Sequence, residues 1–167
     1  MEEFHIRNVM EEDFLKIAEI ARECHPMVTE RNSIYHIFTK FFRSSSLVME
    51  TKVNAKGNII VGFLLGFISQ ENQQDAYIHL LCVAPEYRGN ALAKALIMKF
   101  MDIMVEKGCH RVYLITKPRN KTAIEFYGKL GFKAQSIGKM IKLEGVDTVK
   151  DYNGRGEDMV VFCKTIR

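Results

Sequence analysis

Apolar and polar residues follow two different periods along this chain, and the changes between them predict its elements. Apolar residues recur at helical spacing over residues 11–23, 33–43 and 91–108, with Ser33 as a cap for the second helix. A fourth, short helix is predicted to begin at Thr122, whose spacing to Glu125 has the form of a capping box, and to end at Gly131. Alternating or short apolar runs predict strands at residues 4–9, 47–53, 59–69, 77–83, 111–116, 132–141 and 158–165.

The order of these elements predicts one mixed α/β domain over residues 1–167. The helix at 91–108 joins two strands, and such a crossover makes strands 77–83 and 111–116 parallel neighbours. Residues 54–57 have good turn chemistry, and residues 144–157 form a polar, glycine-rich loop. We therefore expect a twisted sheet of about six to seven strands flanked by about four helices.

Composition narrows the function classes. With 47% hydrophobic and 26% charged residues, the chain has the composition of an ordinary globular protein. The net charge of +4 suits an anionic ligand but is too small and scattered to indicate a nucleic-acid partner. The longest apolar run, at 59–68, is too short to span a bilayer, and no N-terminal signal is visible. We predict a cytoplasmic protein without a membrane partner.

The cysteines indicate reduced thiols rather than a metal site. Cys24, Cys82, Cys109 and Cys163 lie far apart, with no C-x-x-C spacing. Two of them directly precede a histidine, but adjacent residues on a strand or helix point apart and make poor joint ligands. Cys82 is interpreted as a core thiol.

The turn after strand 77–83 predicts an anion site. A strand that runs through a proline turn into a helix leaves the first helical amides without internal partners, and the helix dipole adds positive potential there. Gly89, Ala91 and Ala93 are small enough to let a ligand approach the backbone, and Arg88 adds a fixed charge. A pyrophosphate is the expected ligand.

Two segments resemble the GNAT superfamily of acetyl-CoA-dependent N-acetyltransferases. The first, Arg88-Gly89-Asn90-Ala91-Leu92-Ala93, is similar to the family's Q/R-x-x-G-x-G/A pyrophosphate motif. The second, Asn120-x-x-Ala123-Ile124-x-Phe126-Tyr127-x-x-Leu130-Gly131-Phe132, is similar to the family's second cofactor segment. The resemblance implies the GNAT fold, with a central parallel strand pair splayed apart for coenzyme A, and acetyl-CoA as the co-substrate without a metal. The cofactor-binding residues that it implies are Leu81, Cys82, Val83, Arg88, Gly89, Asn90, Ala91, Leu92, Ala93, Lys94, Asn120 and Tyr127.

One position departs from the family's pattern. The fourth residue of the pyrophosphate motif, usually glycine, is Ala91. We expect a negative φ in the first turn of the helix, where alanine fits without strain. Its methyl group could still crowd the pyrophosphate, so weakened binding is the expected effect.

The resemblance also implies catalytic roles. Acetyl transfer to an amine needs a neutral amine, a stabilised oxyanion and a proton for the leaving thiolate. A backbone amide around residues 81–83 is expected at the oxyanion. Tyr127 is the candidate acid, because a phenol of pKa about 10 can protonate a thiolate whose acid has a pKa of about 8.5, slightly uphill. Packing of the short helix is the alternative role for Tyr127, and turn formation is the alternative for Asn120.

The base is less well defined by the sequence. Many family members carry a glutamate where this chain has Tyr77. If residues 77, 79, 81 and 83 share a strand face, His79 is the nearest group that accepts a proton near neutral pH, and Cys82 faces the opposite way. A histidine satisfied by hydrogen bonds within the sheet is the alternative. Asp75 or Glu86 acting through water could serve instead.

The acceptor stays open between a small-molecule amine and a protein N-terminus. The family places its acceptor site near the first helices, where Glu23, His25 and Glu30 lie, but solvated side chains are the simpler interpretation of these residues. Asp147, Asp151, Glu157 and Asp158 are interpreted in the same way. The alternative function is an acyl-CoA-binding sensor or partner module without catalysis. The sequence leaves both a monomer and a homodimer open.

Overall fold

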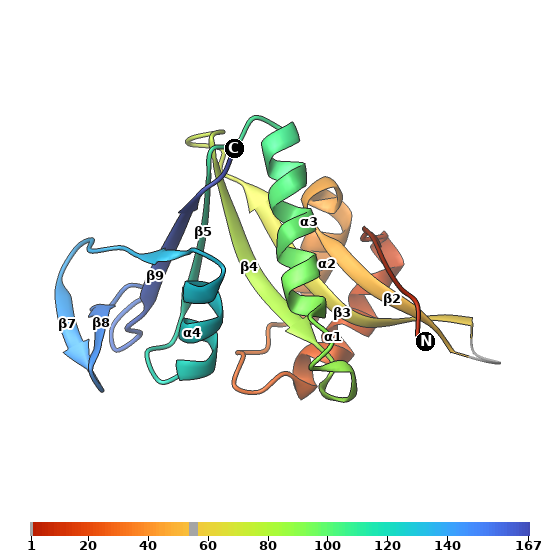
Figure 1. The fold of residues 1–167 in the computed structure, drawn as a ribbon, viewed down its shortest axis with the longest axis horizontal. Coiled ribbons are helices and arrows are strands. Elements are labelled where there is room, and N and C mark those ends of the chain that lie inside the picture. The colour runs from red at the N-terminus through yellow and green to blue at the C-terminus, as the bar shows by residue number, and fades with distance from the viewer. Residues whose placement is uncertain (1, 54–56) are drawn as a thin grey trace.

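The computed structural model describes residues 2–53 and 57–167, so most of the turn predicted at 54–57 lies outside the described residues. Its centre is a seven-stranded sheet with the order β1-β2-β3-β4-β5-β9-β6, and β7 and β8 form a separate hairpin (Figure 1). The strands are β1 (Phe4–Asn8), β2 (Leu47–Val53), β3 (Gly57–Ile68), β4 (Asp75–Val83), β5 (Arg111–Thr116), β6 (Lys133–Ala134), β7 (Met140–Leu143), β8 (Val146–Val149) and β9 (Val160–Thr165).

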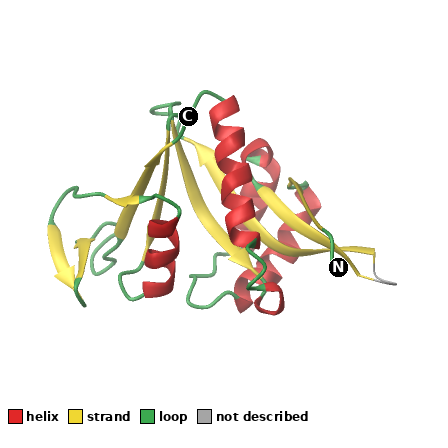
Figure 2. Cartoon of the chain, in the orientation of Figure 1, coloured by secondary structure: helices red, strands yellow, loops and turns green. Residues whose placement is uncertain are grey.

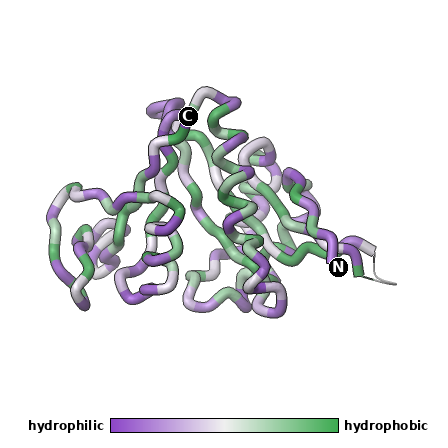
Figure 3. The backbone as a smooth tube through the Cα atoms, viewed as in Figure 1, coloured by the Kyte–Doolittle hydropathy of each residue, from purple (hydrophilic) through white to green (hydrophobic). Residues whose placement is uncertain are grey.

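Helices cover both faces of this sheet (Figure 2). They are α1 (Phe14–Glu23), α2 (Asn32–Phe41), α3 (Leu92–Glu106) and α4 (Lys121–Lys129). Helices α1 and α2 pack on one face and bury Ile17, Tyr35 and Phe38, whereas α3 packs on the other and buries Leu96 and Phe100. The apolar stretches of the chain accordingly run through the middle strands and the inner sides of the helices (Figure 3). The described residues include no helix long and apolar enough to cross a membrane.

Several helix starts differ from the predicted ones. Residues 11–13 form a 3-10 turn before α1, and α2 begins after Arg31 without a side-chain cap, so Ser33 is not the cap. The capping-box prediction at Thr122 was also wrong, because Asn120 Oδ1 accepts from the N–H of Ala123 at 3.2 Å and caps α4 two residues earlier. Asparagine is among the preferred capping residues because its short side chain reaches the free amides of the first turn.

The last third of the chain contains more strands than the sequence predicted. The predicted strand at 132–141 is only the two-residue β6 followed by a loop and the start of β7, and the predicted loop at 144–157 includes β8. Glu144 and Gly145 both have positive φ values, of 49° and 80°, as a two-residue hairpin turn between β7 and β8 requires. Part of the glycine-rich segment that was predicted as a loop is therefore the turn of a hairpin.

A bulge in β4 changes the direction of its side chains. Leu80 pairs with Leu65 of β3, but the next pair is Ile78 with Gly66, so His79 is an extra residue on β4. Leu80 and Cys82 join the core under α1 and α2, whereas Ile78 and Val83 join the core under α3. The prediction that residues 77, 79, 81 and 83 share one face was therefore wrong. His79 stacks on Phe38 of α2 and lies on the same side of the sheet as Cys82. A bulge has this effect because the inserted residue breaks the alternation of a regular strand.

The same strand separates from its parallel neighbour. The pairing of β4 with β5 is parallel, as predicted, but it covers only Asp75 to Tyr77 opposite Arg111 to Tyr113. Beyond these pairs the two strands diverge, and the open end faces the loop that joins α1 to α2 (Figure 1). Residues 78–83 consequently have a free edge on the β5 side.

The prediction of four reduced thiols was wrong in one respect. Cys24, at the end of α1, and Cys82, on β4, form a disulfide with 6.1 Å between their Cα atoms. Cys109 and Cys163 are free thiols. Cys24 and Cys82 are 58 positions apart in the sequence, and the fold brings them together because α1 packs directly against the sheet face on which Cys82 lies.

Candidate active site

A cavity of about 910 Å³ opens where β4 and β5 diverge. Its wall is formed by the loop after α1, by residues 79–83 of β4, by the end of β5, by the start of α4 and by residues 153–159. Of the residues predicted to bind a cofactor, Leu81, Cys82, Val83, Arg88, Ala93, Asn120 and Tyr127 line this cavity. The other five do not line it: Gly89, Asn90 and Ala91 lie on the adjoining turn, and Leu92 and Lys94 lie in the first turn of α3, with Leu92 buried in the core.

The turn into α3 presents a row of free backbone donors. Among the described residues, no acceptor is found for the amide N–H groups of residues 89–94, and the first bond into the helix runs from Ala95 to the carbonyl of Ala91. Gly89 has a φ of 88°, and a Cβ built on it meets no atom within 4 Å. Consecutive free amides at the N-terminus of a 15-residue helix form a suitable site for an anion.

The expectation for Ala91 was wrong in its conformation. Ala91 precedes α3 with φ 57° and ψ 15°, in the left-handed region, rather than with the negative φ of a helical residue. A side chain there crowds its own backbone, so the conformation costs about 1–2 kcal/mol for alanine and very little for glycine. The departure from the family's glycine therefore stores local strain at the anion site.

The open edge of β4 offers backbone groups to a ligand. The N–H of Ala84 donates to the carbonyl of Val61 on β3 at 2.8 Å. Because backbone direction alternates along a strand, the peptide groups of Leu81 and Val83 point away from β3, toward the side from which β5 has diverged. These groups can pair with an extended ligand arm or stabilise an oxyanion.

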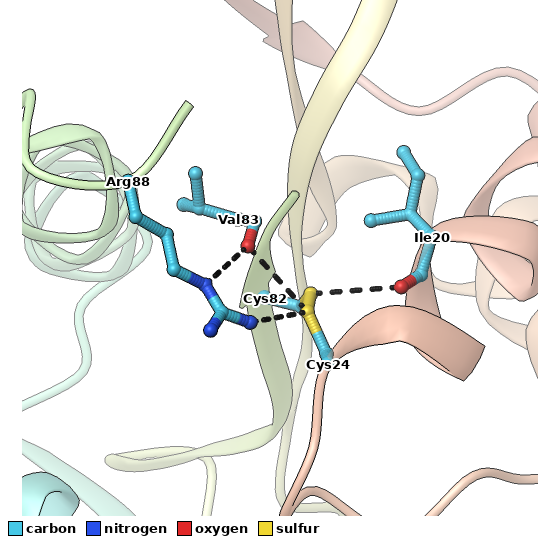
Figure 4. The surroundings of a disulfide bond; sticks show 5 residues. All are labelled: Ile20, Cys24, Cys82, Val83 and Arg88. Atoms are coloured by element: carbon cyan, nitrogen blue, oxygen red, sulfur yellow. Dashed lines mark hydrogen bonds between the residues drawn. A yellow bond between two sulfur atoms is a disulfide. The ribbon is translucent and has the colours of Figure 1, made fainter. Parts of the chain in front are cut away.

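The side chain of Arg88 is hydrogen-bonded to this edge of β4 rather than extended into solvent. Its Nε donates to the carbonyl oxygen of Val83 at 3.1 Å, and its Nη2 lies 3.7 Å from Sγ of Cys24 (Figure 4). The Cys24–Cys82 disulfide thus lies in the cavity wall and links α1 to the end of β4. Arg88 fixes the Val83 carbonyl and brings positive charge to the entrance of the anion site.

Two tyrosines occupy the cavity wall with raised pKa values. Burial raises the pKa of Tyr127 to about 12, and its ring packs against Phe126, Phe132 and Phe162 at centroid distances of 5.4–5.9 Å. Burial likewise raises the pKa of Tyr77 to about 12. Both phenols stay protonated at neutral pH, so each can donate but neither can act as a base.

His79 is one of two histidines among the described residues that line this cavity, and a carboxylate faces it. Its Nε2 lies 3.2 Å from Oε1 of Glu30, and both side chains are about 30% exposed (28% and 30%). Burial lowers the pKa of His79, and the charge of Glu30 partly opposes this effect. Glu30 was interpreted from sequence as a solvated loop residue, and nothing in its spacing indicated a partner 49 positions away.

The other candidate bases do not line the cavity. Asp75 forms an ion pair with Arg111, with 2.7 Å between Oδ1 and Nε, at the paired end of β4. Glu86 lies along a separate cavity of about 90 Å³. Of the acidic residues in the late loop, Glu157 lines the main cavity and forms an ion pair with Lys117. The described residues contain no group of three or more His, Cys, Asp or Glu side chains placed to hold a metal ion.

Comparisons with known proteins agree on one family. The model of the acetyltransferase (GNAT) family matches residues 14–132. An N-alpha-acetyltransferase of Arabidopsis thaliana is 41% identical over 34% of this chain, a match that spans only 30% of that protein. The chain spans less than half the length of this relative and of two further curated relatives.

Two similarities extend over the full fold. A Bacillus subtilis protein, provisionally described as a ribosomal-protein-alanine N-acetyltransferase, is 26% identical over 96% of this chain and 95% of its own length. The crystal structure of Ard1 from Thermoplasma volcanium is similar with a TM-score of 0.74 at 20% identity, over 98% of each chain. With the family model covering more than two thirds of its residues, the chain belongs to the acetyltransferase (GNAT) family.

Proposed function

We propose that this protein is an N-acetyltransferase that moves an acetyl group from acetyl-CoA to a primary amine by direct attack. The relatives described as acetyltransferases act, by their descriptions, on ribosomal-protein alanine and other protein N-termini. We extend that chemistry to this chain with a primary amine, on a peptide N-terminus or a small molecule, as the acceptor.

The geometry fits coenzyme A. The free amides of residues 89–94 would hold the pyrophosphate, because they supply several donors and the positive end of α3 together. The outward N–H and carbonyl of Leu81 and the outward N–H of Val83 would pair with the pantetheine arm, because Arg88 already donates to the Val83 carbonyl. Asn120 uses its side-chain oxygen to cap α4, which leaves its NH₂ group to donate to the same arm. An extended ligand of this kind suits a cavity of about 910 Å³.

The proposed roles of the side chains follow from their pKa values and positions. His79 takes a proton from the acceptor ammonium, the backbone of residues 81–83 stabilises the oxyanion, and Tyr127 gives its proton to the leaving thiolate. A phenol with a pKa of about 12 donates uphill to a thiolate whose acid has a pKa of about 8.5. Burial nevertheless keeps its proton in place until the thiolate forms beside it.

The single observation that carries the proposal is that one cavity contains a histidine, a half-buried tyrosine and a strand edge without a neighbouring strand. His79 on β4 and Tyr127 on α4 are 48 positions apart in the sequence. Both residues line the cavity beside Leu81 and Val83. Acetyl transfer to an amine needs a base, an acid and an oxyanion donor at one place.

The test is release of free CoA thiol from acetyl-CoA with a panel of amines: polyamines, amino acids, aminoglycosides and peptides with different N-terminal residues. The expected result is amine-dependent release that falls at least about tenfold in Tyr127→Phe and in His79→Gln. Unchanged turnover in both variants would show that Tyr127 is not the acid and His79 is not the base. Stabilisation by acetyl-CoA without turnover on any amine would favour the sensor function instead.

The cytoplasmic location and the choice between monomer and homodimer stay predictions. Size-exclusion chromatography with light scattering, performed with and without acetyl-CoA, distinguishes the two oligomeric states.

A further inference from the structure

The loop between α1 and α2 supplies one residue that the proposed reaction has not yet used. Glu30 lies next to the last residue of this loop, and its carboxylate Oε1 lies 3.2 Å from Nε2 of His79. Both residues line the cavity where β4 and β5 diverge. A carboxylate beside an imidazole nitrogen determines which nitrogen keeps its proton.

Helix α2 holds both members of this pair. The hydroxyl of Tyr35, a residue only 1% exposed, accepts a hydrogen bond from the backbone N–H of Glu30 at 2.9 Å. One turn further along α2, the ring of Phe38 stacks on the ring of His79 with 5.1 Å between centroids and 4° between planes. A single helical turn therefore fixes the backbone of the acid and the plane of the imidazole.

The bulge in β4 completes the arrangement. Because His79 is the extra residue of the bulge, its side chain lies on the α2 side of the sheet, together with that of Leu80. A regular strand would alternate the two residues between faces. Bulges commonly redirect a side chain next to a functional site.

We propose that Glu30 is a positioning residue for His79, holding the Nε2–H of the imidazole so that Nδ1 is the atom that takes the proton from the acceptor amine. This inference rests on the proposed function, in which His79 is the base. In the neutral imidazole one nitrogen donates and the other accepts, so a hydrogen bond from Nε2–H to the carboxylate leaves the lone pair on Nδ1. The proton that leaves the ammonium moves to Nδ1, and the amine lone pair then forms the new bond to the acetyl carbon. The bond from that carbon to sulfur breaks, the departing thiolate takes the proton of Tyr127, and the phenolate regains a proton from the new amide nitrogen.

The surroundings of His79 make this carboxylate its main charged neighbour. Tyr77, 6.3 Å away between ring centroids, is neutral at physiological pH because burial raises its pKa to about 12. Glu30 raises the pKa of His79 against the larger effect of burial. The other titratable groups along the same cavity are His25, Arg88, Lys117, Arg119, Lys121, Tyr127 and Glu157.

The test compares Glu30→Gln with Glu11→Gln. Glutamine keeps the size of glutamate and removes its charge. Glu11 is the matched control, because its Oε1 lies 2.9 Å from Nε2 of His36 in an exposed pair that does not line the cavity. We expect Glu30→Gln to lower kcat about tenfold, to leave KM for acetyl-CoA unchanged and to move the acid limb of kcat/KM to lower pH. Glu11→Gln should change none of these quantities.

A second measurement does not depend on turnover. Imidazole ¹⁵N spectra of the free protein report the tautomer and the pKa of each of the five histidines, and the spectrum of His79→Gln assigns the His79 signals. Glu30→Gln should lower the pKa of His79 and reduce its Nε2–H tautomer, whereas Glu11→Gln should alter only His36. Tyr35→Phe, which removes the hydroxyl that holds the Glu30 amide, should reduce the same tautomer.

The outcomes separate this proposal from the proposed function. An unchanged His79 titration in Glu30→Gln would overturn the positioning role, even if activity fell. A rise in KM for the amine with an unchanged kcat would also overturn it, because Glu30 would then bind the acceptor rather than orient the base. A wild-type protein without turnover, but with the expected change in the His79 spectrum, would count against the proposed function and leave the Glu30–His79 contact supported.

Discussion

The ring of His79 lies parallel to the ring of Phe38, with 4° between their planes. This stacking removes one face of the imidazole from water, and burial lowers the pKa of the group because the charged form loses hydration. The same contact fixes the plane in which the ring nitrogens lie. It therefore affects both the protonation and the geometry of the proposed base.

Lowering the pH should destabilise the fold through His79. Its pKa in the folded protein lies below its unfolded value of about 6.5, so the unfolded state binds more protons as the pH falls through that region. The free energy of unfolding should decrease on going from pH 8 to pH 5.5. Denaturant unfolding at the two pH values checks this, and His79→Gln should lose less stability over the same interval. An equal loss in both proteins would contradict the argument.

Ionisation of the Tyr127 phenol should not lower activity at any pH below about 10. Burial raises the pKa of this phenol to about 12, so it keeps its proton over the whole range in which the protein can be assayed. The pH dependence of kcat, measured with an amine at saturation, checks this expectation. An alkaline limb near pH 9 that disappears in Tyr127→Phe would show that the phenol ionises earlier than its burial implies.

Replacing Ala91 by glycine should stabilise the fold and, because it removes a methyl group that crowds the anion site, strengthen acetyl-CoA binding. The substitution removes the strain of a left-handed alanine, about 1–2 kcal/mol. It also costs about 0.5–1 kcal/mol, because glycine loses more conformational entropy on folding than alanine does. We expect a net gain in stability of about 0.5–1 kcal/mol and a lower Kd for acetyl-CoA. Thermal unfolding and calorimetric titration measure the two effects. A lower stability would mean that Ala91 is not strained.

Gly66 should not tolerate a side chain, whereas Gly128 should. A Cβ on Gly66 would lie 2.5 Å from Cε2 of the buried Phe100 and 2.9 Å from the carbonyl oxygen of Tyr77. Overpacking of this kind costs about 1–3 kcal/mol. Gly128, in α4, has no atom within 4 Å of the same position, and alanine there should stabilise the protein by about 0.5–1 kcal/mol. Chemical denaturation of Gly66→Ala and Gly128→Ala should give changes of opposite sign.

The Cys24–Cys82 disulfide should be visible by alkylation. Without a reductant, the unfolded protein should take up label at Cys109 and Cys163 alone, and after reduction at all four cysteines. Because the bond closes a segment of 58 residues, reduction should lower the free energy of unfolding by up to about 4 kcal/mol. Labelling of four cysteines before reduction would show that the two thiols are separate in the isolated protein.

Hydrophobic periodicity predicted elements well where one face of a segment is buried and its flanks are polar. The strand at 111–116 has the predicted bounds for this reason, and the crossover of α3 correctly made it parallel to β4. The periodicity could not locate the bulge, because residues 80–83 are apolar on both faces of the strand and no polar position marks the change. The face of His79 was predicted wrongly as a result.

The candidate site was predictable where local sequence determines local geometry. The turn into α3 depends on residues within a few positions of one another, although the left-handed conformation of Ala91 was not anticipated and the cap of α4 was placed at Thr122 rather than Asn120. The pairing of Glu30 with His79 and of Cys24 with Cys82 depends on how α1 and α2 pack on the sheet. Single-sequence patterns contain no signal for such contacts.

The loop between α1 and α2 is fixed at both of its ends. Cys24 is joined covalently to β4, and the backbone of Glu30 is held by the hydroxyl of Tyr35. The five residues between them, 25–29, include four that line the cavity, and Val28 is 60% exposed. We therefore expect substitutions within residues 25–29 to change the cavity wall while the two attachment points, and the imidazole beside Glu30, keep their geometry. Should this segment contact the acceptor amine of the proposed reaction, acceptor choice and proton transfer would be separable by mutation within a single short loop.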